Sequence, residues 1–148
     1  MRLGFELSFS TAYIFSKSQP FFVALDDITF LKPVEIGDIL KLKSTVVYTK
    51  VIRRKVINSN LKKEKFIVVE VVASVTNPEE GKSAITNVFY FTYHCPLLNE
   101  IKRVKPHTYA EAMKFLEGKR IFDSREITPI DRDLAEIEHQ KRKKKNQV

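Results

Sequence analysis

Carboxylates are the first candidates for chemistry in this sequence, because paired acidic side chains can act as general acid and general base in hydrolysis. Asp26 and Asp27 are adjacent within LDDITFLKPVEIGD at 25–38, where the flanking residues are typical of a β-strand. Successive side chains of a strand point to opposite faces, so the two carboxylates cannot meet at one substrate atom unless a bulge rotates one of them. We expect a structural role for the pair, with direct participation in catalysis as the alternative.

Four other polar residues lie in otherwise apolar stretches. Glu6 lies near the start of the sequence and is a candidate catalytic carboxylate. The structural alternative is that it lies on a polar strip of a helix, beside Arg2. Ser8, Thr11 and Asn87 could orient a water molecule or a substrate amide. Small polar residues in a tightly packed helix are also packing devices, and this alternative stays open.

Cysteine and histidine chemistry has little support. His94 and Cys95 are strand neighbours that face opposite ways, and no third group accompanies them, so we discount a nucleophilic pair. With a single cysteine the chain has no internal disulfide and no cysteine zinc cluster, and its three histidines lack the spacing of metal ligands. We expect no metal and no cofactor, and a reducing compartment fits best.

Basic residues gather in two places. One group lies around a polar loop at 53–65 and comprises Arg53, Arg54, Lys55, Lys62, Lys63 and Lys65. Such side chains suit phosphate recognition, and a solvated hairpin loop is the alternative. The other group, KRKKK at 141–145, supplies five of the formal net charge of +8. It is typical of a solvated end, or of non-specific attraction to nucleic acid or an anionic membrane surface.

No feature predicts sequence-specific nucleic-acid binding, since aromatic residues do not interleave with the basic ones and no groove-reading helix is evident. No stretch is apolar and long enough to span a bilayer, and no signal peptide of the usual pattern is present.

The hydrophobic pattern predicts a helix followed by strands. Residues 1–18 carry apolar residues on nearly all sides, which predicts a buried helix that ends before Pro20. Four strand patterns follow, with turns at 31–38 and 77–82 and a polar loop at 53–65; the strands are 21–30, 39–52, 66–76 and 84–95. A short helix at 107–118 should bury Tyr109, Met113 and Leu116 and stop at Gly118. The pattern of residues 128–148 predicts a mostly solvated helix with a basic end.

One buried helix and four antiparallel strands are best accommodated by a sheet that curls around the helix. This α+β arrangement is the hotdog fold, here with C-terminal helices added. Its exposed strand edges favour side-by-side association of copies. We expect a hotdog domain at 1–120 and a helical basic tail at 121–148.

Three motifs in order carry a family resemblance. VALDDITFLKPVEIGDILKLKSTVVYT, AITNVFYFTYHC and TYAEAMKFLEGKR resemble the second hotdog domain of the two-domain mitochondrial acyl-coenzyme A thioesterases, the acyl-coenzyme A thioesterase 9 group. The similarity runs from Met1 to about Arg120, and residues 121–148 match nothing that we can place. It implies an enzyme that hydrolyses acyl-coenzyme A thioesters to free fatty acid and coenzyme A.

The resemblance also implies roles for individual residues. Glu6 falls near the helix carboxylate that acts as general base or nucleophile in hotdog thioesterases, with help from Asp26 or Asp27 of a neighbouring subunit. Asn87 and the basic residues Arg53, Arg54 and Lys55 would bind substrate. The expected assembly is a homodimer or a higher homo-oligomer, and the expected compartment is mitochondrial, with cytoplasmic as the alternative.

The sequence departs from this family at its start. Family members begin the domain with a strand that carries Asn or Asp, followed by a Phe-Gly-Gly turn whose N–H groups approach the thioester at the helix N-terminus. This sequence begins where the family is already inside the helix, so the first strand is expected to be missing. Two further hypotheses follow from that departure: a catalytically inactive hotdog scaffold that acts as a binding or assembly subunit, and a sequence that is a piece of a longer one.

Overall fold

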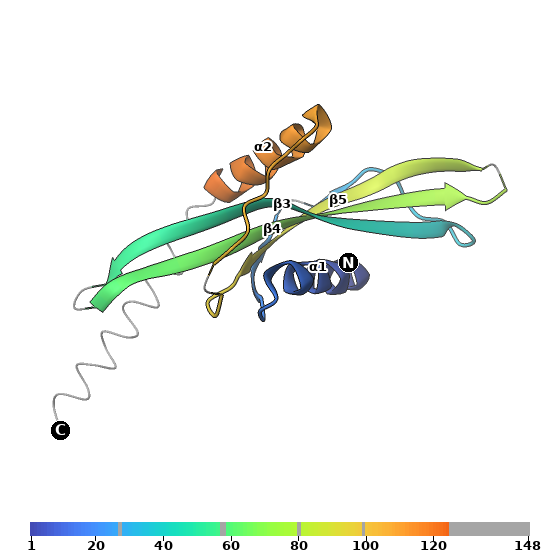
Figure 1. Ribbon diagram of the computed structural model, residues 1–148. Coiled ribbons are helices and arrows are strands. Elements are labelled where there is room, and N and C mark those ends of the chain that lie inside the picture. The colour runs from blue at the N-terminus through green and yellow to red at the C-terminus, as the bar shows by residue number, and fades with distance from the viewer. Residues whose placement is uncertain (27, 57–58, 80, 99, 125–148) are drawn as a thin grey trace, which may run out of the picture.

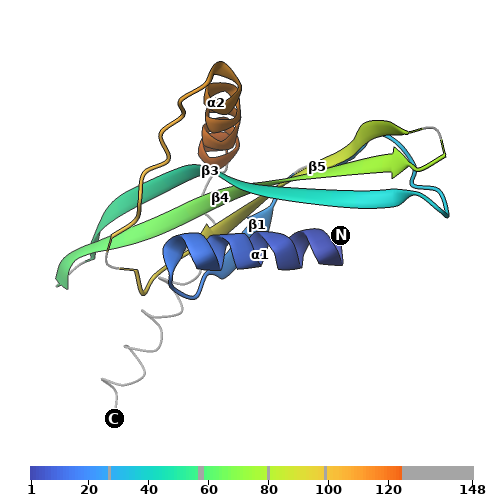
Figure 2. The ribbon, with the colours of Figure 1, turned by 45° about the vertical axis from the view of Figure 1, so that its right-hand side comes forward.

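The computed structural model describes residues 1–124 except 27, 57–58, 80 and 99, and it leaves the side chains of 29–30, 54–56 and 59–62 undescribed. Two helices lie on opposite faces of one antiparallel sheet (Figures 1 and 2). The sheet order is β1-β5-β4-β3, and β2 also pairs with β5. In chain order the elements are α1 (Arg2–Ser16), β1 (Phe21–Leu25), β2 (Thr29–Phe30), β3 (Ile39–Val56), β4 (Ser59–Asn77), β5 (Lys82–His94) and α2 (Tyr109–Ser124). The predicted α+β hotdog architecture is confirmed.

α1 covers one face of the sheet through a row of small residues. The buried residues of the helix are Gly4, Ser8, Ala12 and Ser16. They lie on an apolar sheet surface whose largest fully buried side chains are Tyr93, Phe91 and Ile67. Small side chains let the helix backbone approach the strands closely.

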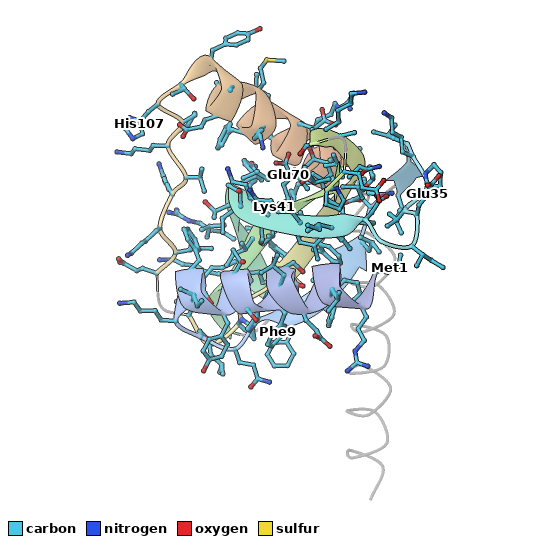
Figure 3. All side chains as sticks on the ribbon, turned by 90° about the vertical axis from the view of Figure 1, so that its right-hand side faces the viewer. Met1, Phe9, Glu35, Lys41, Glu70 and His107 are labelled. Atoms are coloured by element: carbon cyan, nitrogen blue, oxygen red, sulfur yellow. The ribbon has the colours of Figure 1, made fainter. Side chains whose placement is uncertain are left out.

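The expectation of a helix buried on nearly all sides is wrong for the single chain. Large apolar residues at the start of the chain and along α1 stay exposed, and they are Met1, Leu3, Phe5, Tyr13 and Ile14. The physical reason is that the sheet packs on one side of α1 only, as the view along the sheet shows (Figure 3).

α2 covers the opposite face, where Phe122 packs with Tyr48, Phe66 and Val68. The predicted buried face of this helix is wrong, since Tyr109, Met113 and Leu116 are exposed. The predicted stop at Gly118 is wrong as well, because the helix continues to Ser124.

The strands differ from the prediction in length and in face. The expected loop at 53–65 is wrong, since β3 and β4 remain paired as far as Val56 and Ser59. A bulge between Val46 and Tyr48 adds one residue to β3. As a result Val46 packs on the α1 side, whereas Tyr48 packs on the α2 side. A strict two-residue alternation over 39–52 would place both residues on one face, because pattern alone does not reveal an inserted residue.

The segment between β5 and α2 carries the chain from one face of the sheet to the other. Figures 1 and 2 show it passing around β3 on its way to α2. The Thr49 hydroxyl donates a hydrogen bond to the Lys102 carbonyl at 3.2 Å. The buried Lys65 ammonium donates another to the Leu98 carbonyl.

Candidate active site

Glu6 lies in the first turns of α1 with its carboxylate toward solvent. Its side chain is 53% exposed, and the Arg2 Nε donates to Glu6 Oε1 at 2.8 Å. The polar strip that was the alternative at sequence level is therefore present. The carboxylate is accessible to a substrate, which a fully buried group would not be.

An aromatic cluster extends from α1 to β1 beside Glu6. Phe5 forms its centre, with ring centroids 5.4 Å from Phe22 and 6.1 Å from Phe91. Tyr93 joins the cluster through Phe9 and Phe22, at 6.2 Å and 6.1 Å. Phe5 and Phe22 are partly exposed, so the cluster presents an apolar surface on which an alkyl chain could lie.

Below α1, two hydroxyl pairs connect the helix to the sheet. Ser8 Oγ lies 2.6 Å from the Tyr93 hydroxyl, and both residues are fully buried. On the β3 side, Ser44 Oγ donates to Thr11 Oγ1 at 2.8 Å. Ser8 and Thr11 thus hold α1 on the sheet, which fits the packing role.

Asn87 is a buried residue of β5 near the N-terminal half of α1. It pairs with Ala73 of β4 and with Phe30 of β2. Asn87 and Phe89 are two residues apart on β5, so their side chains lie on the same face of the sheet, the one that α1 covers. The structure therefore places Glu6 and Asn87 on the same side of the sheet.

Asp26 lies on the other side. Its backbone N–H donates to the Tyr90 carbonyl at 3.0 Å, directly after β1 ends. It lines a cavity of about 680 Å³ together with Tyr90, Glu117 and Arg120, beside α2. One chain does not bring Glu6 and Asp26 together, and Asp27 lies outside the described residues.

The structure describes the predicted phosphate-binding residues only in part. Arg53 is exposed on β3, where its backbone is opposite Lys63 of β4. Arg54 and Lys55 also belong to β3, and their side chains lie outside the described part of the chain. Lys65, which was grouped with them, is instead buried beneath the segment that follows β5.

His94 and Cys95 take no part in a catalytic pair. His94 stacks on Phe66 at 5.0 Å, whereas Cys95 is buried in the core under α1. Burial raises the pKa of the Cys95 thiol, so the reactive thiolate is disfavoured.

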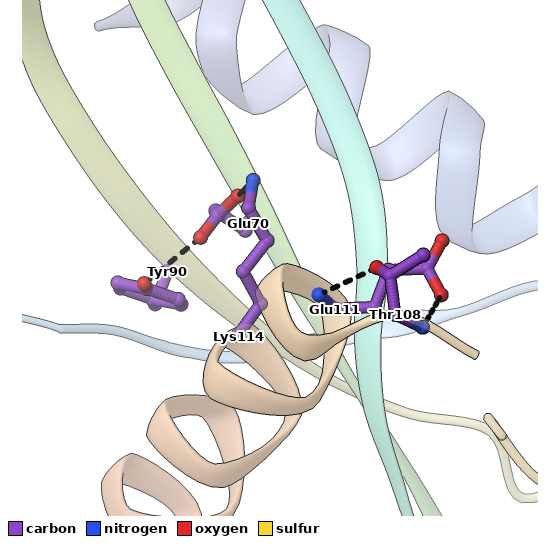
Figure 4. Close-up of polar contacts among 5 residues, drawn as sticks. All are labelled: Glu70, Tyr90, Thr108, Glu111 and Lys114. Atoms are coloured by element: carbon purple, nitrogen blue, oxygen red, sulfur yellow. Dashed lines mark hydrogen bonds and ion pairs between the residues drawn. The ribbon is translucent and has the colours of Figure 1, made fainter. Parts of the chain in front are cut away.

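A polar cluster between the sheet and α2 escaped the sequence analysis. Glu70 of β4 accepts a hydrogen bond from the Tyr90 hydroxyl at 2.9 Å and forms an ion pair with Lys114 of α2 (Figure 4). Burial, and next the Glu70 carboxylate, raise the pKa of Tyr90 well above its ordinary value. The signal that could have found the cluster is one acidic residue inside the apolar run FIVVEVV.

The N-terminus of α2 is capped by side chains, as Figure 4 also shows. Glu111 Oε2 accepts from the backbone N–H groups of His107 and Thr108, at 2.8 Å and 3.2 Å, and the Glu111 N–H donates to Thr108 Oγ1 at 3.2 Å. The two backbone hydrogen bonds, that of His107 first, lower the pKa of the Glu111 carboxyl.

The described residues contain neither a metal-binding cluster nor a membrane-spanning helix. Across residues 1–124, apart from the gaps named above, no group of three or more His, Cys, Asp or Glu side chains could hold a metal ion. Over the same part of the chain no helix has the length and apolar character needed to cross a membrane.

Sequence comparison places the chain among known proteins. It is 40% identical over 124 residues to human mitochondrial acyl-coenzyme A thioesterase 9, an alignment that covers 84% of this chain and 25% of the relative. The chloroplastic acyl-coenzyme A thioesterase 2 of Humulus lupulus is also 40% identical, over 121 residues that cover 77% and 26% of the two chains. This chain is a relative of the acyl-coenzyme A thioesterase 9 group. The resemblance inferred from three motifs is confirmed.

The aligned region spans about a quarter of the length of these curated thioesterases. No family model matches the chain. The thioesterase 9 relatives of human, cattle and mouse are named as mitochondrial proteins.

Solved structures of acyl-CoA hydrolases share the fold. The enzyme from Bacillus cereus matches with a TM-score of 0.72 at 16% identity, covering 92% of this chain and 77% of that one. The Staphylococcus aureus hydrolase in complex with butyryl coenzyme A and coenzyme A matches with a TM-score of 0.67 at 19% identity, covering 91% and 76%. At these identities the likeness establishes the hotdog fold.

Proposed function

We propose that this domain hydrolyses acyl-coenzyme A thioesters to a fatty acid and coenzyme A, with Glu6 as general base. The observation that carries the proposal is an accessible carboxylate at the start of the hotdog helix, beside an aromatic surface that extends from Phe5 to Phe22. The sequence relationship to acyl-coenzyme A thioesterases supports it.

The proposed reaction needs no group beyond water and the chain. Glu6 takes a proton from a water molecule, and the oxygen attacks the thioester carbonyl carbon. The tetrahedral intermediate collapses with cleavage of the carbon–sulfur bond, and the proton held by Glu6 passes to the departing thiolate. The products are the carboxylic acid and the free thiol of coenzyme A.

The remaining site residues take binding roles in this proposal. The acyl chain lies on the aromatic cluster, Asn87 orients the substrate, and the basic residues Arg53, Arg54 and Lys55 attract the coenzyme A phosphates. Asp26 or Asp27 acts from a neighbouring copy of the chain, since Asp26 lies on the face of the sheet opposite Glu6. The proposal thus includes a homodimer or higher homo-oligomer, in the mitochondrion.

Release of free thiol from a panel of acyl-coenzyme A esters tests the activity. We expect Glu6→Gln to lower kcat by about 10²- to 10⁴-fold, the contribution typical of a general base. Glu79→Gln, which removes an exposed carboxylate from the turn between β4 and β5, is the matched control and should leave kcat unchanged.

Two results would contradict the proposal in different ways. Thiol release that survives Glu6→Gln would remove Glu6 from the mechanism. No release above background from any ester would exclude the activity and favour a scaffold without catalysis.

A further inference from the structure

Strand β5 carries two tyrosines that engage the two helices separately. Tyr93 contacts Ser8 of α1, whereas Tyr90 contacts Glu70, which in turn is paired with Lys114 of α2. The two residues are three positions apart on one strand, so their side chains lie on opposite faces. Each phenol therefore belongs to the packing of a different helix.

The hydrogen-bond direction at Tyr93 can be deduced. Ser8 Oγ has one hydrogen, and the hydroxyl donates it to the Phe5 carbonyl at 2.8 Å. The contact of 2.6 Å between Ser8 and Tyr93 must then use the phenol as donor. The chain of donors runs from Tyr93 to Ser8 to the backbone of α1.

The same pattern recurs on the β3 side of the helix. Ser44 Oγ donates to Thr11 Oγ1 at 2.8 Å, and Thr11 Oγ1 donates to the Leu7 carbonyl at 2.9 Å. We call each of these chains of two hydrogen bonds a relay. The two relays start on two different strands and reach α1 one turn apart, at Ser8 and Thr11.

These relays provide directional contacts that the apolar packing lacks. The row of small residues under α1 makes a smooth contact surface, and the hydrophobic effect does not fix orientation. Hydrogen bonds depend on distance and angle, so two of them on either side of the helix axis resist both rotation and sliding. Glu6 precedes Ser8 by two residues, so it moves as a rigid part of the same turns.

We propose that Tyr93 and Ser44 are positioning residues that fix the orientation of α1 and thereby the location of the Glu6 carboxylate. This inference rests on the proposed function, in which Glu6 acts on a bound thioester. A misplacement of about 1 Å can cost about 10²-fold in rate, so a small movement of α1 has a large kinetic effect.

Tyr93→Phe tests the inference with little change in shape. It removes one hydroxyl, and we expect kcat to fall about tenfold while KM changes less than twofold. Tyr90→Phe is the matched control, because it removes the same hydroxyl from the same strand on the α2 face. It should lower stability while leaving the position of α1 unchanged, which separates positioning from general destabilisation.

A double-mutant cycle with Ser8→Ala tests whether Tyr93 acts through Ser8. If the relay is real, the double variant loses no more activity than Tyr93→Phe alone. Additive losses in kcat, or an unchanged kcat in Tyr93→Phe, would overturn the inference. Ser44→Ala should lower kcat independently, through Thr11.

Amide hydrogen exchange supplies a readout that does not need activity. Tyr93→Phe should speed exchange in α1 and spare α2, and Tyr90→Phe should do the reverse. If the domain shows no thioesterase activity, the proposed function fails, and exchange alone decides whether Tyr93 fixes α1. Equal exchange in α1 of wild type and Tyr93→Phe would overturn the inference in either case.

Discussion

At the scale of single residues, the most buried carboxylate in the described part of the chain is that of Glu70. Its side chain is 5% exposed, and its described partners are the Tyr90 hydroxyl and the Lys114 ammonium. A buried charge is tolerated only when it is paired and hydrogen-bonded. Removal of either partner should therefore be more costly than removal of a surface charge.

We predict that Lys114→Met lowers the free energy of unfolding by about 1–3 kcal/mol, because it leaves the Glu70 carboxylate buried beside the phenol alone. The lysine side chain is itself 43% exposed, which keeps the value below that of a fully buried pair. Urea denaturation measures the change. Lys119→Met, an exposed lysine of the same helix, is the control and should change stability by less than about 0.5 kcal/mol.

A second variant separates the charge from the packing. Glu70→Gln combined with Lys114→Met removes both charges, and it should be more stable than Lys114→Met alone. If the double variant is less stable than Lys114→Met, the cost lies in lost side-chain packing and the ion pair is not its source.

Residue types indicated which side chains could react, but not which ones meet. The two-residue period of a strand was enough to separate His94 from Cys95. It could not show that Glu6 and Asp26 lie on opposite faces, since that depends on long-range pairing of β1 with β5. Nor could it show that Tyr93 reaches Ser8, a contact across 85 positions of sequence.

At the scale of elements, Gly118 determines how closely α2 approaches the sheet. A Cβ at this position would lie 2.8 Å from Val47 Cγ2 and 3.2 Å from Tyr48 Cβ. Both neighbours belong to the β3 bulge, so helix and bulge fit each other. The sequence alone favours Gly118 as a helix stop, because glycine ends many helices. Tertiary packing explains why it stands inside one instead.

Gly118→Ala should destabilise the protein by about 1–2 kcal/mol, because the gain of about 1 kcal/mol in helix propensity is smaller than the cost of overpacking against Val47. Gly4→Ala is the opposite case, since its Cβ would meet Phe89 and Val71 at 3.9 Å, an ordinary contact. That variant should gain about 0.5–1 kcal/mol. Thermal unfolding of the two variants compares them directly, and a stabilising Gly118→Ala would show that α2 can shift away from β3.

Element types were more predictable than element lengths. Runs of β-branched and aromatic residues identified the long strands, because the sheet carries a hydrophobic cluster on each of its faces. The same criterion placed a loop at 53–65 because lysines and asparagines there weaken the pattern, whereas backbone pairing continues to Val56 and Ser59 regardless of side-chain polarity. The buried face of α2 was mispredicted because the close contact of Gly118 with β3 decides which side of the helix faces the sheet. The apolar residues that begin at Tyr109 do not decide it.

At the scale of the whole molecule, apolar surface remains uncovered near the β1 edge. Phe21 and Phe22 are 47% and 49% exposed, and Tyr13 and Ile14 of α1 are exposed as well. Among the described residues β1 has a strand partner on one side only, β5. An unpaired edge with exposed aromatic residues favours pairing with a second copy.

We therefore predict that the protein self-associates through β1, and that Phe21→Lys shifts it toward the monomer in sedimentation experiments. A lysine at an edge strand opposes pairing because the charge must be desolvated on association. Tyr109→Lys, which places the same charge at an exposed aromatic residue of α2 on the other face of the sheet, is the control and should keep the wild-type mass. The proposed contribution of Asp26 or Asp27 from a neighbouring copy adds a kinetic consequence: thioesterase activity should fall with dissociation of Phe21→Lys and recover at high protein concentration. A fully monomeric Phe21→Lys variant with wild-type kcat would show that one chain contains the complete site.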